Sequence, residues 1–233
     1  LTTLWRGNLR YTPAMLFSIG LVSSFITGGI TGIILADSAL DIAVHDTYFV
    51  VAHFHVVMGL SAIFGMFAGV YHWFPKMYGR MMNSKMGMAH FWLTLVSAYG
   101  VFFPMHFVGI GGAPRRYYDY SVYEGFDSNQ YEMFVDLNIV ITIFAIIGGL
   151  AQIIFIFNFF WSASKGQVAT QNPWKGCSLE WTTPVEHIHG NWPGEIPEVH
   201  RWPYDYSKPG KEQDFVPQTV PLEDGEMDGG AGH

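Results

Sequence analysis

The sequence predicts an all-α fold, a polytopic transmembrane helical bundle of four spans followed by an extended C-terminal tail. Only 13% of the 233 residues are charged, against roughly a quarter in ordinary soluble domains. The 12 basic and 19 acidic side chains also avoid four windows, which are 11–36, 47–75, 86–114 and 137–164. Each window exceeds the ~20 residues that cross the hydrocarbon core of a bilayer as a helix. A water-soluble domain is therefore excluded as the leading interpretation.

The composition changes along the chain and divides it into a membrane part, 1–161, and a tail, 162–233. The tail holds eight prolines and four tryptophans and shows neither helical nor strand periodicity. We expect it to be extended and cytoplasmic, with a disordered end from Glu223 to His233. The net charge of −7 gives no support to nucleic-acid binding. The single cysteine, Cys177, excludes an internal disulfide and a multi-cysteine metal centre.

The basic residues of the connections indicate the orientation in the membrane. They precede the first window and fill the second connection: Arg6, Arg10, Lys76, Arg80 and Lys85. The positive-inside rule places these segments in the cytoplasm. The first connection, 37–46, has three aspartates and no basic residue, which suits the outer face. The third connection should share that face, yet it carries Arg115 and Arg116, so this pair requires a local anionic partner.

The second window contains two candidate ligands, His53 and His55. Ionisable side chains inside a bilayer are costly and are functional candidates by default. Residues two positions apart on an α-helix differ by roughly 200°, so these imidazoles project from nearly opposite sides and do not easily share a metal ion. The spacing suits two separate centres, and neutral imidazole is a common axial ligand of haem iron. The alternative is that both are polar residues hydrogen-bonded to neighbouring helices.

His45 and Asp46 open the same span, about 12 Å above His53 along the helix axis. Near the outer membrane surface, adjacent nitrogen and oxygen ligands can bind Mg²⁺ or Mn²⁺. The alternative, which the spacing alone favours, is a helix N-cap formed by Asp46 and Thr47. The two roles are compatible with each other.

The arginine pair, Arg115 and Arg116, falls on the same outer side. Haem propionates would supply the missing anion, because a guanidinium binds a carboxylate through two parallel hydrogen bonds. Taken alone, the Arg115–Arg116 dipeptide is more typical of an interfacial pair that contacts lipid phosphate than of a propionate-binding pair. Three further membrane histidines are isolated near the ends of the windows and are assigned no role: His72, His90 and His106.

Two long motifs carry a resemblance to a known family. HDTYFVVAHFHVVMG at 45–59 and GGAPRRYYDY at 111–120 closely resemble subunit I of the haem–copper oxidase superfamily, in its cytochrome c oxidase branch. The likeness covers about 1–161, which in that family is the last four of twelve core helices. Because the chain also starts at Leu1 without a methionine, we expect it to be a piece of a longer subunit.

The resemblance implies a cofactor for each histidine of the second window. His53 matches the axial ligand of the high-spin haem A, where oxygen binds, and His55 matches a ligand of the low-spin haem A. The copper ligands of the family, which hold copper B in the assembled site, lie on earlier helices and are absent from this chain.

The resemblance also implies roles at the outer surface. His45 and Asp46 match magnesium ligands, in a site that a carboxylate of subunit II completes. Asp41 is similar to the acid near the propionate of the high-spin haem, and Arg115 and Arg116 match propionate-binding arginines.

The function that the resemblance implies is that of part of an aa-type cytochrome c oxidase, which reduces oxygen to water and pumps protons. The implied partners are the remaining helices of subunit I, subunits II and III, cytochrome c and the lipid bilayer, with no nucleic acid. The implied location is a bacterial inner membrane or, alternatively, the mitochondrial inner membrane. Rival interpretations are a quinol oxidase or nitric oxide reductase of the same superfamily, and a non-redox transporter or assembly subunit.

Overall fold

The computed structural model describes residues 1–5, 7, 9–184, 191–206 and 213–225. The prediction of an all-α membrane protein is confirmed, because the described residues contain four helical segments long and apolar enough to cross a membrane. Their bounds are Pro13–Ala36, Tyr48–Tyr78, Ser84–Ile110 and Ser128–Lys165. Arg6 and most of the end that was expected to be disordered, 226–233, lie outside the described residues.

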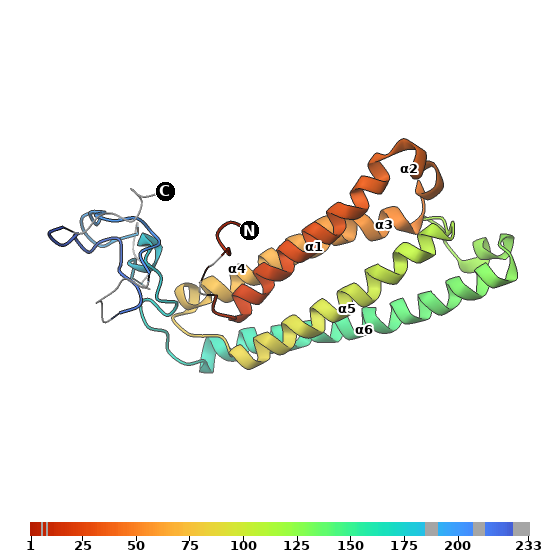
Figure 1. The fold of residues 1–233 in the computed structure, drawn as a ribbon. Helices are drawn as coiled ribbons and strands as arrows, with labels where there is room; N and C mark the ends of the chain where they lie inside the picture. The colour runs from red at the N-terminus through yellow and green to blue at the C-terminus, as the bar shows by residue number, and fades with distance from the viewer. Residues whose placement is uncertain (6, 8, 185–190, 207–212, 226–233) are drawn as a thin grey trace. The chain divides into compact units, whose positions relative to one another are not determined.

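The elements follow one another along the chain as shown in Figure 1. They are α1 (Pro13–Ala36), α2 (Ser38–Val44), α3 (Tyr48–Phe54), the π-helical segment η1 (His55–Leu60), α4 (Ser61–Tyr78), α5 (Ser84–Ile110), the 3₁₀ helix η2 (Tyr120–Gly125), α6 (Ser128–Lys165) and the 3₁₀ helix η3 (Leu179–Trp181). The segments α3, η1 and α4 form one continuous span.

Local capping residues determine where α1 begins and where it breaks from α2. Thr12 caps the start of α1 by accepting a hydrogen bond from the Met15 amide, and Pro13 occupies the first turn, where its missing N–H is not needed. At the other end, Asp37 stops α1 in an extended conformation and caps α2 through the amides of Ala39 and Leu40. The short helix α2 therefore turns the chain back at the end of the membrane unit (Figure 1).

Close helix contacts fix the span formed by α3 and η1 between α1 and α5. A Cβ on Gly28 of α1 would lie 2.8 Å from the Val57 backbone nitrogen, and a Cβ on Gly109 of α5 would lie 2.0 Å from the Phe49 backbone nitrogen. Only glycine permits these approaches, which is how membrane helices gain packing contact in the absence of a hydrophobic driving force between them.

A buried polar network joins α4, α5 and α6. The imidazole of His90 is fully buried, with Nδ1 3.2 Å from the Tyr71 hydroxyl and Nε2 3.2 Å from the Gln152 side-chain oxygen. The Gln152 amide nitrogen in turn donates to the Thr94 hydroxyl at 3.1 Å. His90 is thus a buried polar residue whose two ring nitrogens both have partners.

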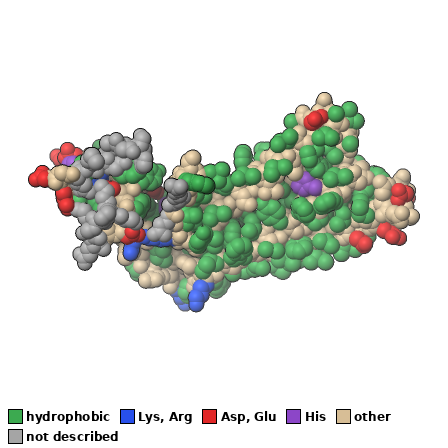
Figure 2. Space-filling view, viewed as in Figure 1, with side chains coloured by type: hydrophobic (Ala, Val, Ile, Leu, Met, Phe, Trp, Pro, Cys, Tyr) green, Lys and Arg blue, Asp and Glu red, His purple; other side chains and the backbone are tan. Residues whose placement is uncertain are grey.

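The chain divides into two compact units, and each is described by itself. The membrane unit comprises Leu1–His72 and Met82–Ser164, and the second unit comprises Trp73–Met81 and Lys165–His233. Apolar side chains cover most of the visible face of the membrane unit, with charged side chains gathered toward its ends (Figure 2). The helix α6 buries only 6% of its most apolar window, so most of this helix is available to lipid or to other protein.

The tail in the second unit is not simply extended, since it has a small buried centre. Arg201 and Asp205 form an ion pair at 2.6 Å with side chains only 1% and 3% exposed. The guanidinium also donates to the carbonyls of Val220 and Pro221, both at 2.8 Å. Next to this pair, the buried Cys177 thiol donates to the Asp205 carbonyl at 3.4 Å. These contacts link segments far apart in sequence, which periodicity cannot reveal.

Candidate functional site

The two candidate ligands lie at the end of α3 and the start of η1, each half-buried. A π-helical turn begins at His55. Such turns widen the helix by one residue and are frequent at functional sites. No pattern of residues predicts this turn.

His53 faces α1. Its Nδ1 lies 2.9 Å from the Gly28 carbonyl and 2.9 Å from the Thr31 hydroxyl. A carbonyl oxygen can only accept, so Nδ1 carries the proton, and the Thr31 hydroxyl is left to donate to the Gly28 carbonyl at 2.8 Å. The lone pair of His53 is therefore on Nε2.

His55 faces α5 instead. Its ring stacks on Phe102 of α5 with centroids 5.1 Å apart and an angle of 17° between the planes. Its Nδ1 donates to the Val51 carbonyl, one turn earlier on α3, at 2.8 Å. The lone pair of His55 is likewise on Nε2.

The two rings thus contact different helices, and each has its Nδ1 held by a backbone carbonyl. This is how metal-ligating histidines are commonly oriented, because a hydrogen bond at one ring nitrogen fixes the tautomer and directs the other nitrogen toward the metal. The donor set fits two separate haem irons, one on each flank of the span, and does not fit one shared ion.

A third histidine with the same pattern is His106 of α5, which sequence reasoning had left without a role. Its Nδ1 donates to the Phe102 carbonyl at 2.8 Å, and its ring meets Phe49 edge-on with centroids 5.0 Å apart. Its Nε2 is buried and has no hydrogen-bond partner among the described residues. A buried acceptor of this kind requires water or a bound group to complete it, which also fits a cofactor beside α3.

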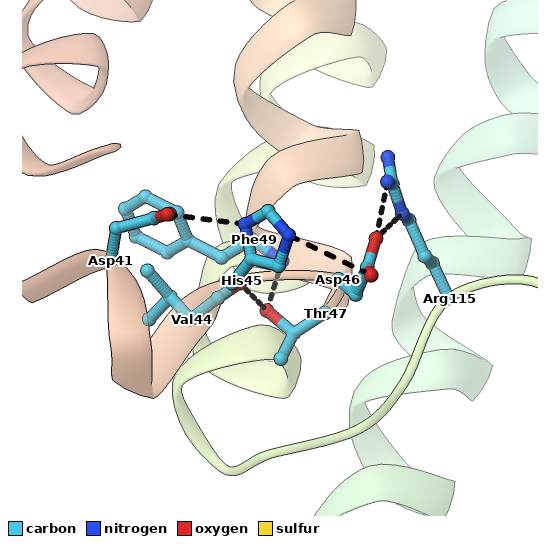
Figure 3. Close-up of polar contacts among 7 residues, drawn as sticks. All are labelled: Asp41, Val44, His45, Asp46, Thr47, Phe49 and Arg115. Atoms are coloured by element: carbon cyan, nitrogen blue, oxygen red, sulfur yellow. Dashed lines mark hydrogen bonds and ion pairs between the residues drawn. The ribbon is translucent and has the colours of Figure 1, made fainter. Parts of the chain in front are cut away.

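The residues predicted near the outer surface meet at the junction of α2, α3 and the loop after α5 (Figure 3). His45 Nδ1 lies 3.1 Å from Asp41 Oδ2, and His45 Nε2 lies 3.7 Å from Asp46 Oδ2. On the other side of Asp46, Arg115 donates from Nε to Oδ1 at 2.7 Å and also from Nη2. The four side chains form a single line of alternating acid and base.

The backbone holds this line in place. The Tyr48 amide donates to the Ala113 carbonyl at 3.1 Å, and the Arg115 amide donates to the Asp46 carbonyl at 3.0 Å. Asp46 and Arg116 adopt the left-handed conformation, with φ of 56° and 65°. This conformation costs energy for a non-glycine residue and persists where the surroundings determine it.

The helix cap in this region is made by Thr47. Its hydroxyl accepts from the Phe49 amide at 3.2 Å and donates to the Val44 carbonyl at 2.6 Å. Asp46, the other residue considered as a cap, pairs with Arg115 instead. The Asp46 carboxylate therefore takes no part in the cap.

The charges around Asp46 keep its carboxylate ionised. The hydrogen bond from the Arg115 side chain is the main cause that lowers the pKa of Asp46, and the charges of Arg115, His45 and Arg116 lower it further. Sequence reasoning missed the Arg115–Asp46 pair because 69 positions separate the two residues. Arg116 is exposed.

His45 and Asp46 fit part of a cation site. With Nδ1 held by Asp41, the lone pair on His45 Nε2 lies on the side of the Asp46 carboxylate, so these two acceptors could share a cation. The described residues contain no group of three or more histidine, cysteine or acidic side chains that could complete a metal site. Further ligands would have to come from water or from residues outside the described part of this chain.

The fold and the site together define a polytopic membrane protein in which one span carries two candidate histidine ligands, one in contact with α1 and one in contact with α5. Residues 1–164 match the family described as cytochrome c and quinol oxidase polypeptide I, and the chain belongs to this family.

The similar proteins with known names agree with this assignment. The alternative cytochrome c oxidase subunit 1 of Bradyrhizobium diazoefficiens is 44% identical over 228 residues, which are 97% of this chain and 38% of that protein. The cytochrome c oxidase subunit 1 of Thermostichus vulcanus is 45% identical over 204 residues, which are 88% of this chain and 35% of that protein. The chain therefore spans little more than a third of the length of these relatives.

A solved structure shares the fold. A chain from a cryo-EM structure of a heme-copper terminal oxidase dimer superposes with a TM-score of 0.58 at 20% identity, covering 67% of this chain and 27% of that chain. At this identity the comparison supports the helical arrangement alone.

Proposed function

We propose that this chain is the haem-ligating part of a terminal oxidase of the aa type, which reduces oxygen to water with electrons from cytochrome c and pumps protons. The observation that carries the proposal is the pair of histidines whose Nδ1 atoms are held by backbone carbonyls and whose rings contact α1 and α5 respectively. The names of the relatives, which are cytochrome c oxidase subunits, support the choice of activity.

In this proposal His53 would hold the iron of the high-spin haem A and His55 would hold that of the low-spin haem A. Bound haem iron supplies the electron transfer and the oxygen chemistry, together with copper B on helices outside this chain. The chain fixes which nitrogen of each imidazole would face the metal and sets the separation of the two ligands through one helix. The Gly28 carbonyl and the Thr31 hydroxyl hold the His53 proton at Nδ1, and the Val51 carbonyl holds that of His55.

The residues at the outer surface, Asp41, His45, Asp46, Arg115 and Arg116, have a separate role in this proposal. His45 and Asp46 contribute two ligands to Mg²⁺, and a carboxylate of subunit II completes the site. Arg115 and Arg116 neutralise haem propionates, and Asp41 lies near the propionate of the high-spin haem. Because Arg115 already binds Asp46, the guanidinium would link the magnesium ligand to the propionate charge.

The proposed setting is a multi-pass position in a bacterial plasma membrane, beside the remaining helices of subunit I and subunits II and III. The bacterial relatives and the four apolar spans support this location. A quinol oxidase is the second candidate, because the matching family includes quinol oxidases.

Optical spectra of the purified assembly test the haem assignment. His53→Ala should remove the high-spin haem band and spare the low-spin band, and His55→Ala should do the reverse. Identical spectra for the two variants would contradict separate centres, and an assembly without haem absorption would favour a non-redox transporter. Reduction by cytochrome c but not by quinol separates the two oxidase classes.

A further inference from the structure

A groove of about 580 Å³ opens between α5 and α6 in the membrane unit. This volume lies within the range of ligand pockets, ~300–1,000 Å³. Apart from the amine of one lysine, its walls are apolar: Lys85, Met86, Ala89, Ile153, Ile154 and Phe157. The groove takes no part in the haem or magnesium sites.

The mouth of the groove is cationic and amphipathic. The Lys85 side chain is exposed, and no ion pair joins it to a carboxylate of the described residues. Trp161 is one helical turn beyond Phe157 on the same face of α6 and is 40% exposed. A lysine and a tryptophan at the end of a membrane span are typical of the headgroup level of a bilayer.

An exposed apolar track continues from the groove toward the middle of the bilayer. On α5 it includes Leu93 and Val96, which are 41% and 56% exposed, and on α6 it includes Leu150, which is 58% exposed. These residues follow Ala89 and precede Ile153 at helical spacing, so they share the faces that line the groove. A linear hydrocarbon chain could lie along this track.

We propose that the groove binds an anionic phospholipid, with the phosphate on Lys85 and one acyl chain along the track between α5 and α6. Charge selects this occupant over an apolar helix of a partner, since a helix would leave the Lys85 amine without a counter-charge. The connection that carries Lys85 is also expected to face the cytoplasm, where anionic lipids attract basic residues beside membrane helices.

A photoactivatable phosphatidylglycerol, with the reactive group in its acyl chain, tests the site in the native assembly reconstituted in nanodiscs. Peptide mapping should locate crosslinks in 85–96 and 150–157. Lys85→Gln should lower labelling about fivefold, because one basic residue near the surface contributes ~1 kcal/mol. Lys165→Gln is the matched control, because it removes a lysine at the end of α6 that does not line the groove, and labelling should not change.

Phosphatidylcholine with the same reactive group separates charge from shape. We expect weaker labelling of the groove by this zwitterionic lipid and a smaller effect of Lys85→Gln on it, because the choline ammonium offsets the phosphate charge, whereas Ala89→Trp should block both lipids by filling the groove. The proposal is overturned if the groove is not crosslinked, as when another helix covers it, if Lys85→Gln has no effect, or if Lys165→Gln reduces labelling equally.

Discussion

The glycine beside the His53 ring provides a sharp test of how α1 positions that ligand. A Cβ added at Gly32 would lie 3.0 Å from His53 Cε1, 3.7 Å from Nε2 and 3.8 Å from Nδ1. Ordinary van der Waals contacts begin at 3.4 Å, so the imidazole must move by about 0.4 Å or α1 must move away. Because Cε1 is bonded to both ring nitrogens, the displacement moves Nε2, the atom that would bind metal, together with Nδ1.

The same helix contains a control. A Cβ at Gly29 would meet nothing within 4 Å. Both Gly29→Ala and Gly32→Ala gain up to ~1 kcal/mol from helix propensity, but only Gly32→Ala pays for overpacking, which typically costs about 1–3 kcal/mol. The difference in unfolding free energy between the two variants should therefore be about 1–3 kcal/mol, with Gly29→Ala the more stable.

Thermal unfolding and haem spectra of the purified assembly measure the two consequences separately. We expect Gly32→Ala to lower the unfolding temperature relative to Gly29→Ala and to shift the high-spin haem band without changing the low-spin band. Equal stability and unchanged spectra in both variants would refute the placement of the His53 ring against α1. A stability difference without a spectral shift would support the packing of the His53 ring against α1 but refute the assignment of His53 to the high-spin haem.

Four further outcomes are expected. Thr31→Val removes the hydroxyl near His53 Nδ1 and should lower the free energy of unfolding by about 0.5–1.5 kcal/mol. It should also change the iron–histidine stretching band in resonance Raman spectra, and an unchanged band would count against the role of Thr31. Arg115→Gln should shift the haem potentials and lower the number of protons pumped per electron, and wild-type values of both would argue against it. Burial raises the pKa of Cys177, so the folded tail keeps this proton longer than the unfolded tail. The free energy of unfolding of the tail should then fall as pH rises above the ordinary thiol pKa of ~8.5. Arg201→Ala leaves the Asp205 charge buried without a partner, so it should lower the free energy of unfolding by about 3–5 kcal/mol. It should also speed alkylation of Cys177, which peptide mass spectrometry can measure. An unchanged alkylation rate would show that the Arg201–Asp205 pair does not keep Cys177 buried.

The spans were predictable because a bilayer excludes charge along a fixed length of helix. The charge-free windows therefore mark the hydrocarbon region and not the helix ends. The last helix, α6, begins at Ser128, nine residues before its window at 137. Its first turns carry Glu132 and Asp136, which water can solvate while the backbone stays helical.

The details that escaped prediction depend on contacts between distant segments or on the packing of neighbouring helices. The π-helical turn at His55 leaves no mark in composition, since the same residues could form a regular α-helix. The Arg115–Asp46 pair requires the loop after α5 to reach the start of α3. The anionic partner expected for Arg115 is thus the Asp46 carboxylate of this chain. The role of Arg115 and Arg116 in binding haem propionates stays a prediction.

The two candidate ligands differ in what orients them. His55 donates to a carbonyl of its own helix, four residues earlier, as His106 does on α5. Such a contact forms whenever the helix forms, because a helical carbonyl has a second lone pair to offer. His53 donates to the Gly28 carbonyl of α1, so its orientation exists only while α1 and α3 stay in close contact. Movements of α1 should therefore act on the proposed oxygen-binding centre and leave the electron-delivering centre unchanged, which gives one helix separate control over one of two ligands.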